Sequence, residues 1–335
     1  MPTANVKSST RKIAFNYIIS TPSSSSAKSI DKSLPTLLFI HAVYLGPQIF
    51  QWQFQDPQIR RFNCVAVDLR LHGLTTGDPL PEGYGAQEAA EDLALFMEEI
   101  KLPACHLVGL SMGTVVAVGL AVYYPNKVAS LFLVSPLGLE ELADVADGRR
   151  QIAEYWREGF KTGEPDMAVI SDAVYGAQQL GFSNNPNSLA NALLNISLPL
   201  ALKKCVPENF DQYDRATIDF LNNRKEYTTE ELSRIHVPVK LVHCLGDIAY
   251  PQEYTERFMQ QLKDAAVAVS LATIPEAPHF GVVTHGDIVN QLLHNFIIAS
   301  CATSVPPAPR EVSSPWEAEL IKAGWKECES DSEDD

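Results

Sequence analysis

The segment Gly109-Leu110-Ser111-Met112-Gly113 carries the clearest chemical signal in this sequence. It follows an apolar run and directly precedes a helical pattern over residues 114–124. A serine on such a tight strand-to-helix turn has a strained backbone, and glycines two positions to either side remove side chains that would collide with it. The turn also makes the Met112 N–H available to an oxyanion. We therefore predict that Ser111 is a nucleophile.

The sequence also offers a base and an acid to serve Ser111. A serine hydroxyl is a weak nucleophile until a neighbouring base takes its proton and a carboxylate orients that base. Of the eight histidines, His279 follows a predicted strand and precedes the last predicted helix, and His285 in the same loop is the alternative. Asp247 also follows a predicted strand and is the candidate acid, with a turn or helix cap as its alternative role. The chain order Ser111, Asp247, His279 is typical of a doubly wound hydrolase sheet and differs from both common serine-protease orders.

A second backbone donor for the oxyanion is expected in the turn after the first central strand, His41-Ala42-Val43-Tyr44-Leu45-Gly46. The Val43 N–H is the predicted donor, and the Ala42 N–H is the alternative. We expect His41 to brace this loop by hydrogen bonds. Tyr44 and Leu110 are the predicted substrate contacts.

Short apolar runs alternate with longer helical patterns through most of the chain. The predicted strands are residues 37–40, 64–67, 105–108, 131–134, 239–242 and 267–274. The predicted helices are residues 88–100, 114–124, 252–262 and 287–298. Apolar strands alternating with helices indicate an α/β fold with a doubly wound, mostly parallel sheet that is covered on both faces.

The alternation stops between Pro136 and His236, an interval too long for one crossover. We predict an inserted helical cap over residues 137–236, between two halves of the hydrolase core at 34–136 and 237–299. Insertions after the carboxyl edge of a sheet commonly cover the site there, so a lid is the predicted role and structural filler the alternative.

The two ends of the chain differ in composition from this core. Residues 1–33 are predicted to form an N-terminal strand region and a Ser-rich loop, and residues 300–335 an acidic, Pro-containing tail. We expect residues 21–33 and the chain from Cys301 onward to be poorly ordered. Within the tail, residues 317–326 have the pattern of a short helix, with Trp316 and Trp325 packing back on the body.

Composition excludes several classes of protein. The chain has 335 residues, 46% of them hydrophobic, and a net charge of −15. A negative charge of this size provides no overall positive potential that would attract the phosphates of a nucleic acid. It has neither an apolar run of the roughly 20 residues that a membrane-spanning helix needs nor a secretory signal. Its six cysteines form no C-x-x-C pair and have no histidine at metal-ligand spacing. We therefore expect a cytoplasmic protein without a metal or other cofactor.

Five segments together resemble the motifs of the α/β-hydrolase family, and specifically of its capped, cofactor-independent members. They are a strand followed by His-Gly-x, an Asp-x-Arg-Gly-x-Gly segment, the nucleophile elbow, the acid loop and a Gly-His-aromatic loop, at residues 38–46, 68–73, 109–113, 246–251 and 278–280. Four positions depart from the family pattern, and none of them removes a catalytic side chain: Ala42, Leu71, Thr114 and Pro278. The resemblance implies the α/β-hydrolase fold with Ser111, Asp247 and His279 as its triad.

The chemistry expected of such a triad is hydrolysis of an ester, thioester or lactone through an acyl-enzyme, on a small to medium, largely apolar substrate. The elbow sequence is similar to those of carboxylesterases and enol-lactonases. The same triad also serves carbon–carbon bond hydrolysis or acyl transfer to an acceptor other than water, because the cap decides what enters. A non-catalytic ligand receptor or partner-binding module on the same fold is the alternative from a different class.

Overall fold

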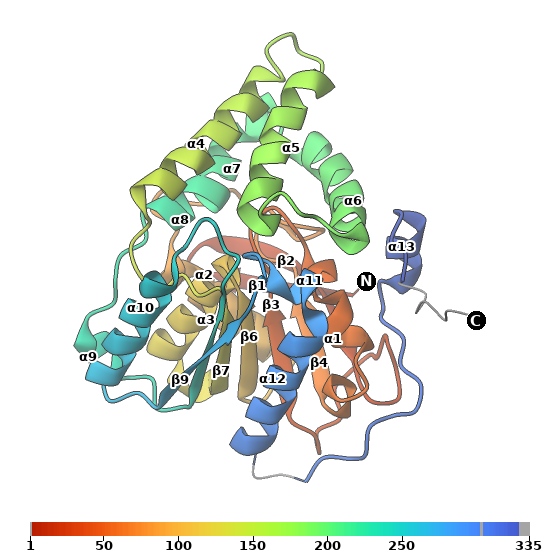
Figure 1. The fold of residues 1–335 in the computed structure, drawn as a ribbon, viewed down its shortest axis with the longest axis vertical. Helices are drawn as coiled ribbons and strands as arrows, with labels where there is room; N and C mark the ends of the chain where they lie inside the picture. Colours follow the sequence, from red (N-terminus) through yellow and green to blue (C-terminus); the bar gives the residue numbers. More distant parts are fainter. Residues whose placement is uncertain (1, 302–303, 328–335) are drawn as a thin grey trace.

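The computed structural model describes residues 2–301 and 304–327. In this part of the chain a nine-stranded sheet runs through the centre of the molecule, with helices on both faces (Figure 1). The strand order is β1-β2-β4-β3-β6-β7-β8-β9, and β5 lies beside β2. The strands are β1 (Thr3–Ser8), β2 (Arg11–Ser20), β3 (Thr36–Ile40), β4 (Asn63–Val67), β5 (Thr76–Gly77), β6 (Cys105–Leu110), β7 (Val128–Val134), β8 (Val239–Cys244) and β9 (Val269–Ile274).

The sheet is mostly parallel, as predicted. Neighbouring strands from β4 to β9 all pair in parallel. Only the N-terminal part departs from this, because β2 pairs antiparallel with β1, β4 and β5. All six predicted strands are present, so the α/β fold class is confirmed.

Two hydrophobic clusters hold the helices against the two faces of the sheet. Alternate residues of β3 enter different clusters: Leu38 and Ile40 face one, and Leu37 and Phe39 face the other. A strand covered on both faces must be apolar throughout, and this is why the central strands are uninterrupted apolar runs in the sequence. The helices of the first face are α2 (Ala86–Glu99), α3 (Met112–Tyr123) and α10 (Gln252–Asp264), and those of the second are α1 (Gln51–Gln55), α11 (Gly281–Thr284) and α12 (Gly286–Ser300).

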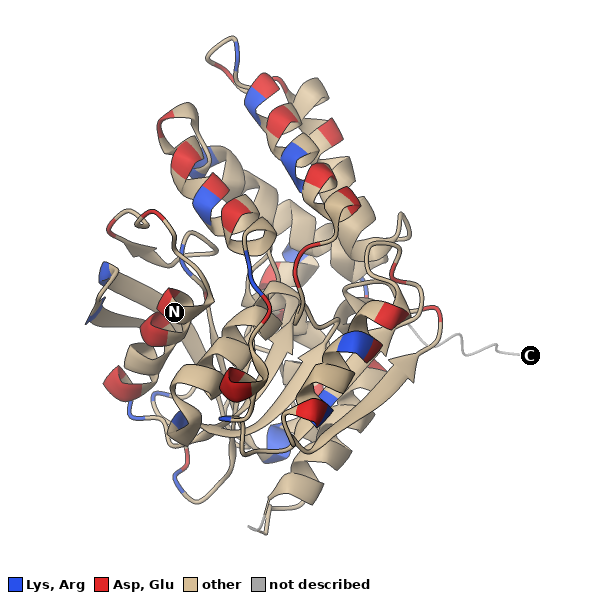
Figure 2. Ribbon diagram, turned by 90° about the vertical axis from the view of Figure 1, so that its left-hand side faces the viewer, with Lys and Arg blue, Asp and Glu red and all other residues tan. Residues whose placement is uncertain are grey.

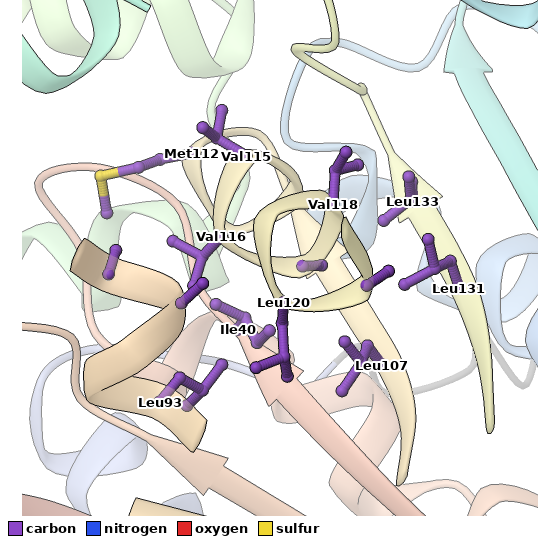
Figure 3. Packing of buried hydrophobic residues seen from close by; sticks show 14 of the residues in the cluster. Ile40, Leu93, Leu107, Met112, Val115, Val116, Val118, Leu120, Leu131 and Leu133 are labelled. Carbon is purple, nitrogen blue, oxygen red and sulfur yellow. The ribbon is translucent and has the colours of Figure 1, made fainter. Parts of the chain in front are cut away.

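Helix α3, which begins directly after Ser111, is the most deeply buried helix of the core. Figure 3 shows its side chains, among them Val116 and Leu120, packed among Ile40, Leu107 and Leu131 of three neighbouring strands. Burying each side chain of this size contributes about 1.5–3 kcal/mol. Packing on all sides thus anchors the helix whose first turn carries the predicted nucleophile.

A group of helices stands on the carboxyl edge of the sheet, within the interval predicted as an inserted cap (Figure 1). We refer to α4–α8 as the cap helices. Their role as a lid stays a prediction. The cap helices and the short helix that follows them are α4 (Ala143–Glu158), α5 (Met167–Phe182), α6 (Ser188–Lys204), α7 (Phe210–Asp214), α8 (Phe220–Asn222) and α9 (Thr229–Leu232).

The expected lack of order in the C-terminal tail is wrong for residues 304–327. Trp316 and Trp325 are buried, and their rings contact Phe54 and Trp52 of α1 at centroid distances of 4.6 and 5.7 Å. Between the two tryptophans the predicted short helix forms as α13 (Glu317–Lys322). Two large aromatic side chains thus anchor a segment whose overall composition is that of a loose tail. The acidic ending, residues 329–335, lies outside the described residues.

The expectation for residues 21–33 is also wrong, because Arg60 ties this segment to the same region. Its buried guanidinium donates to the carbonyl oxygens of Thr21 and Ser24, at 2.6 and 2.8 Å, and to that of Ser313, at 2.9 Å. One cation therefore joins the Ser-rich loop to the C-terminal segment.

Charged residues occur along the cap helices and on several core helices, while most of the sheet carries none (Figure 2). Within the described ranges, no single helix has both the length and the apolar character to cross a membrane. The helices over Ser188–Lys204 and Pro207–Asn222, bent by 84° at their junction, satisfy both criteria only when taken together.

Candidate active site

Ser111 occupies a strained turn between β6 and α3. Its backbone angles are φ 51° and ψ −116°, a backbone conformation that residues other than glycine rarely adopt. A Cβ atom at Gly113 would lie 2.0 Å from the carbonyl oxygen of Ile40, and one at Gly109 would lie 2.9 Å from the carbonyl oxygen of Gly113. The two glycines therefore do what the sequence pattern predicts, because they allow close backbone approach on both sides of the serine.

The structure brings Ser111, His279 and Asp247 together in one hydrogen-bonded chain. Ser111 Oγ lies 2.8 Å from His279 Nε2, and His279 Nδ1 lies 2.5 Å from Asp247 Oδ2. A carboxylate accepts only, so Nδ1 carries the proton and Nε2 is free to accept from the serine hydroxyl. The exposed fraction is 1% for Ser111 and 0% for His279. Burial shields this chain of polar groups from competing water.

Neighbouring groups hold the acid and the base in place. Asp247 Oδ1 accepts the N–H groups of Ala249 and Tyr250, at 2.9 and 3.1 Å, so both carboxylate oxygens have partners. The Tyr250 ring stacks on His279, with ring centroids 5.1 Å apart and an angle of 27° between the planes. Ser135 Oγ donates to the His279 carbonyl oxygen at 2.6 Å. The imidazole is therefore fixed from its ring face, its nitrogen atoms and its backbone.

The remaining histidines near the sheet have structural partners. His41 Nε2 accepts from the Leu69 N–H at 2.9 Å and Nδ1 donates to the Ala42 carbonyl at 2.7 Å, so His41 braces the loop as predicted. Burial lowers the pKa of His41 to about 3, which keeps its ring neutral. The alternative base, His285, lies beside Thr284, with Nδ1 2.9 Å from Thr284 Oγ1, rather than in the Ser111 chain.

The two predicted oxyanion donors lie in neighbouring turns of the same core cluster. Val43 follows β3, Met112 begins α3, and both are buried. Among the described residues, neither backbone N–H donates to another group. Their role toward an oxyanion stays a prediction.

A cavity of about 380 Å³ lies between the loops that follow β3 and β4 and the cap helices α4–α7. Its wall is mostly apolar, with Ile152, Ala153 and Trp156 contributed by α4. Tyr44 lines this cavity, and its role as a substrate contact stays a prediction. Leu110 does not line it, because its side chain is fully buried in the second hydrophobic cluster. Leu110 is the strand residue directly before the nucleophile and points into the core. The structure therefore does not support the prediction that it contacts the substrate.

Two residues near Ser111 were not predicted as parts of the site. Thr114, which replaces a glycine of the family pattern, donates to the Ser111 carbonyl at 2.6 Å and accepts from the Leu137 N–H at 2.9 Å. It thus connects the elbow to the chain leaving β7. Tyr250 stacks on His279, and its only sequence signal is an aromatic residue three positions after the candidate acid. Within the described ranges, no three His, Cys, Asp or Glu side chains group as metal ligands.

A mostly parallel sheet with a buried Ser-His-Asp chain at its carboxyl edge defines a class of α/β hydrolases. The model of the alpha/beta hydrolase family matches residues 37–292, so the chain belongs to this family. The match includes Ser111, Asp247 and His279, and it spans the cap helices as well as the core.

Three known proteins illustrate the range of relatives. The chain is 41% identical over 104 residues, 31% of its length, to the dihydrolipoyllysine-residue acetyltransferase component of an acetoin cleaving system from Cupriavidus necator. It is 30% identical over 158 residues, 44% of its length, to a 2-(acetamidomethylene)succinate hydrolase from Mesorhizobium japonicum. These alignments span 27% and 55% of the two relatives. A thermophilic esterase from Thermogutta terrifontis has the same fold, with a TM-score of 0.68 and 17% identity over 90% of this chain and 99% of that one.

Proposed function

We propose that this protein is a serine hydrolase that cleaves an ester, thioester or lactone through an acyl-enzyme. The observation that carries the proposal is the buried hydrogen-bonded chain from Asp247 through His279 to Ser111. A serine, a base and an orienting acid at these distances are the groups that nucleophilic acyl transfer requires. Membership of the alpha/beta hydrolase family supports the same chemistry.

The reaction begins when Ser111 Oγ attacks the carbonyl carbon and His279 Nε2 takes the hydroxyl proton. Asp247 stabilises the imidazolium that forms, and the Val43 and Met112 N–H groups donate to the oxyanion. When the tetrahedral intermediate collapses, the bond to the leaving alcohol, thiol or ring oxygen breaks and Nε2 returns the proton to that group. Water then repeats the sequence on the acyl-enzyme, which releases the acid and restores the serine hydroxyl.

The cavity beside Tyr44 is the proposed substrate site. Its volume of about 380 Å³ suits a small to medium substrate, and its apolar wall suits hydrocarbon parts of that substrate. The cap helices α4–α7 form much of this wall, so we propose that the cap selects the substrate.

Acyl transfer is the second candidate, because a partial relative is named as an acetyltransferase component. The two reactions share every step up to the acyl-enzyme and differ only in the acceptor. Product analysis separates them: hydrolysis releases the free acid, and acyl transfer produces a new ester, thioester or amide when an alcohol, thiol or amine is added.

Labelling with a fluorophosphonate tests the proposed function directly. We expect one adduct in the intact mass, mapped to Ser111 by peptide analysis, and none in the Ser111→Ala variant. Turnover of simple esters or lactones by the wild type and its loss in the variant complete the test. A folded wild-type protein that neither reacts nor turns over any such substrate would contradict the proposal and favour a binding module.

A further inference from the structure

A buried ionic cluster lies next to the candidate triad, where α4 meets the core. Glu141 accepts from two guanidinium groups: Arg149 Nε lies 3.3 Å and Arg224 Nη1 lies 2.9 Å from its Oε2. The Tyr250 hydroxyl donates to Glu141 Oε1 at 2.9 Å. The exposed fractions of the three charged side chains are 2%, 0% and 4%, in the order Glu141, Arg149, Arg224.

The charges of this cluster do not balance. Arginine stays protonated in proteins, so two cations face one carboxylate and leave one positive charge in excess. A buried charge without a partner is strongly unfavourable, because neither water nor a counter-ion stabilises it. Among the described residues, the cluster therefore holds one positive charge more than its carboxylate balances.

The vacant donor belongs to Arg149 and not to Arg224. Arg224 donates to the carbonyl oxygens of Leu139 and Leu221, both at 2.7 Å, as well as to Glu141 and a tyrosine hydroxyl. Arg149 uses Nε for Glu141 and Nη2 for the Tyr250 hydroxyl at 3.1 Å. Its Nη1 is buried and has no hydrogen-bond partner among the described residues.

The position of Arg149 connects this donor to the proposed substrate site. Arg149 lies three and four residues before Ile152 and Ala153, which line the cavity, so it lies on the same face of α4, and its own side chain is buried and is not part of the lining. Tyr250 contacts Arg149 through its hydroxyl and stacks on His279 through its ring. Tyr44, on the cavity wall, is close enough to Arg149 for the guanidinium to lower its pKa, although burial has the larger, opposite effect.

We propose that Arg149 Nη1 binds a carboxylate that the substrate carries in addition to its scissile carbonyl, with the Tyr44 hydroxyl at the same end of the cavity. This inference rests on the proposed function and narrows the expected apolar substrate to one with a single anionic end. A guanidinium matches the planar geometry of a carboxylate. The excess of one positive charge suits this monoanion better than a dianionic phosphate group.

The kinetic test compares two p-nitrophenyl esters that differ only in charge, mono-p-nitrophenyl glutarate and its methyl ester. Hydrogen bonds to a charged group favour the carboxylate ester by about 10- to 100-fold in kcat/KM in the wild type. We expect Arg149→Met to bring this ratio close to one and Arg149→Lys to keep part of it. Arg150→Met is the matched control, because this neighbouring side chain of α4 is 51% exposed and pairs with Asp147 outside the cluster, and we expect it to keep the ratio.

A binding test separates this inference from the proposed function. Calorimetry on the Ser111→Ala variant compares monomethyl glutarate with dimethyl glutarate, and requires no turnover. Tighter binding of the monoanion by at least about tenfold supports the carboxylate site, even if fluorophosphonate labelling fails. Equal binding of both probes, or a kinetic preference that persists in Arg149→Met, would overturn the carboxylate site and leave the serine hydrolase proposal standing.

Discussion

At the scale of single residues, the chemistry of the candidate site depends on which atoms of Ser111, His279 and Asp247 carry a proton. One oxygen of Asp247 accepts from His279 and the other accepts from two backbone N–H groups, so this carboxylate is held in one orientation. Orientation fixes the imidazole tautomer that accepts the Ser111 proton. Charge stabilises the imidazolium that follows.

We expect Asp247→Asn to reduce kcat on a p-nitrophenyl ester by about 10⁴-fold, because an amide holds the imidazole in the wrong tautomer and supplies no charge. Fold is preserved, since the asparagine oxygen still accepts the Ala249 and Tyr250 N–H groups. Steady-state kinetics with circular dichroism as the control measures this. Full activity in the variant would move the acid role to another residue.

Asp68 gives a prediction on pH. Its buried carboxylate accepts from Leu74 and Asn16 through Oδ2, while Oδ1 has no hydrogen-bond partner among the described residues, and burial raises its pKa from 3.8 to about 6. The folded state therefore holds this proton more tightly than the unfolded chain, and the contribution of Asp68 to stability falls as the pH rises from about 4 to 6. We expect Asp68→Asn to be more stable than the wild type at pH 7, by about 1–3 kcal/mol, and this advantage to shrink at pH 4. Urea unfolding at both pH values checks it, and a constant difference would refute it.

At the scale of elements, the elbow is a junction where a strand, a helix and a neighbouring strand approach closely. Helix α3 starts directly beneath β3, and Gly113 is the point of contact with the Ile40 carbonyl. The strain at Ser111 is maintained because α3 is packed on all sides by apolar side chains. Side-chain packing around α3 therefore helps to hold the serine at the helix N-terminus.

Gly113→Ala places a Cβ atom 2.0 Å from that carbonyl oxygen, so either the helix or the strand must move. We expect a loss of about 2–3 kcal/mol in the free energy of unfolding together with slower labelling of Ser111 by a fluorophosphonate. Gly148→Ala in α4 is the control, because nothing lies within 4 Å of its added Cβ. An alanine there stabilises the helix by about 0.5–1 kcal/mol. If chemical denaturation gives Gly113→Ala and Gly148→Ala the same free energy of unfolding, the close approach to the Ile40 carbonyl does not explain why position 113 requires glycine.

At the scale of the whole molecule, the C-terminal segment joins the core to the cap. Trp316 and Trp325 pack on α1 of the core, and Asn195 of α6 donates to the Ala323 carbonyl at 2.9 Å. Glu319 of α13 also lines the cavity. A segment outside the hydrolase core is thereby part of the surroundings of the proposed substrate site.

We expect Trp316→Ala to lower the free energy of unfolding by about 3–5 kcal/mol, because the side chain is 1% exposed and leaves a large cavity. Ile321→Ala in the adjoining helix α13 is the control, since Ile321 is 55% exposed and its loss changes stability by less than about 0.5 kcal/mol. Thermal unfolding of both variants provides the comparison. A Trp316 variant as stable as the wild type would show that the segment does not support the core.

The fold class and the three residues of the candidate chain were predictable from local pattern. Gly109 and Gly113 around Ser111 mark a turn by steric necessity, and uninterrupted apolar strands indicate a sheet covered on both faces. Asp247 and His279 were found because the carboxyl ends of parallel strands meet at one edge. Periodicity and turn chemistry are local properties, so one sequence suffices to read them.

Only the tertiary structure decided which buried groups lack a partner and what surrounds the cavity. Arg149 and Arg224 are equivalent in the sequence, yet contacts with distant carbonyl oxygens complete one guanidinium and leave a donor of the other vacant. Leu110 faces the core and Tyr44 the cavity, although Leu110 directly precedes Ser111 and Tyr44 directly follows Val43. The C-terminal tryptophans find their partners more than 250 residues away. Such pairings depend on how distant segments pack, and no local pattern of residues encodes them.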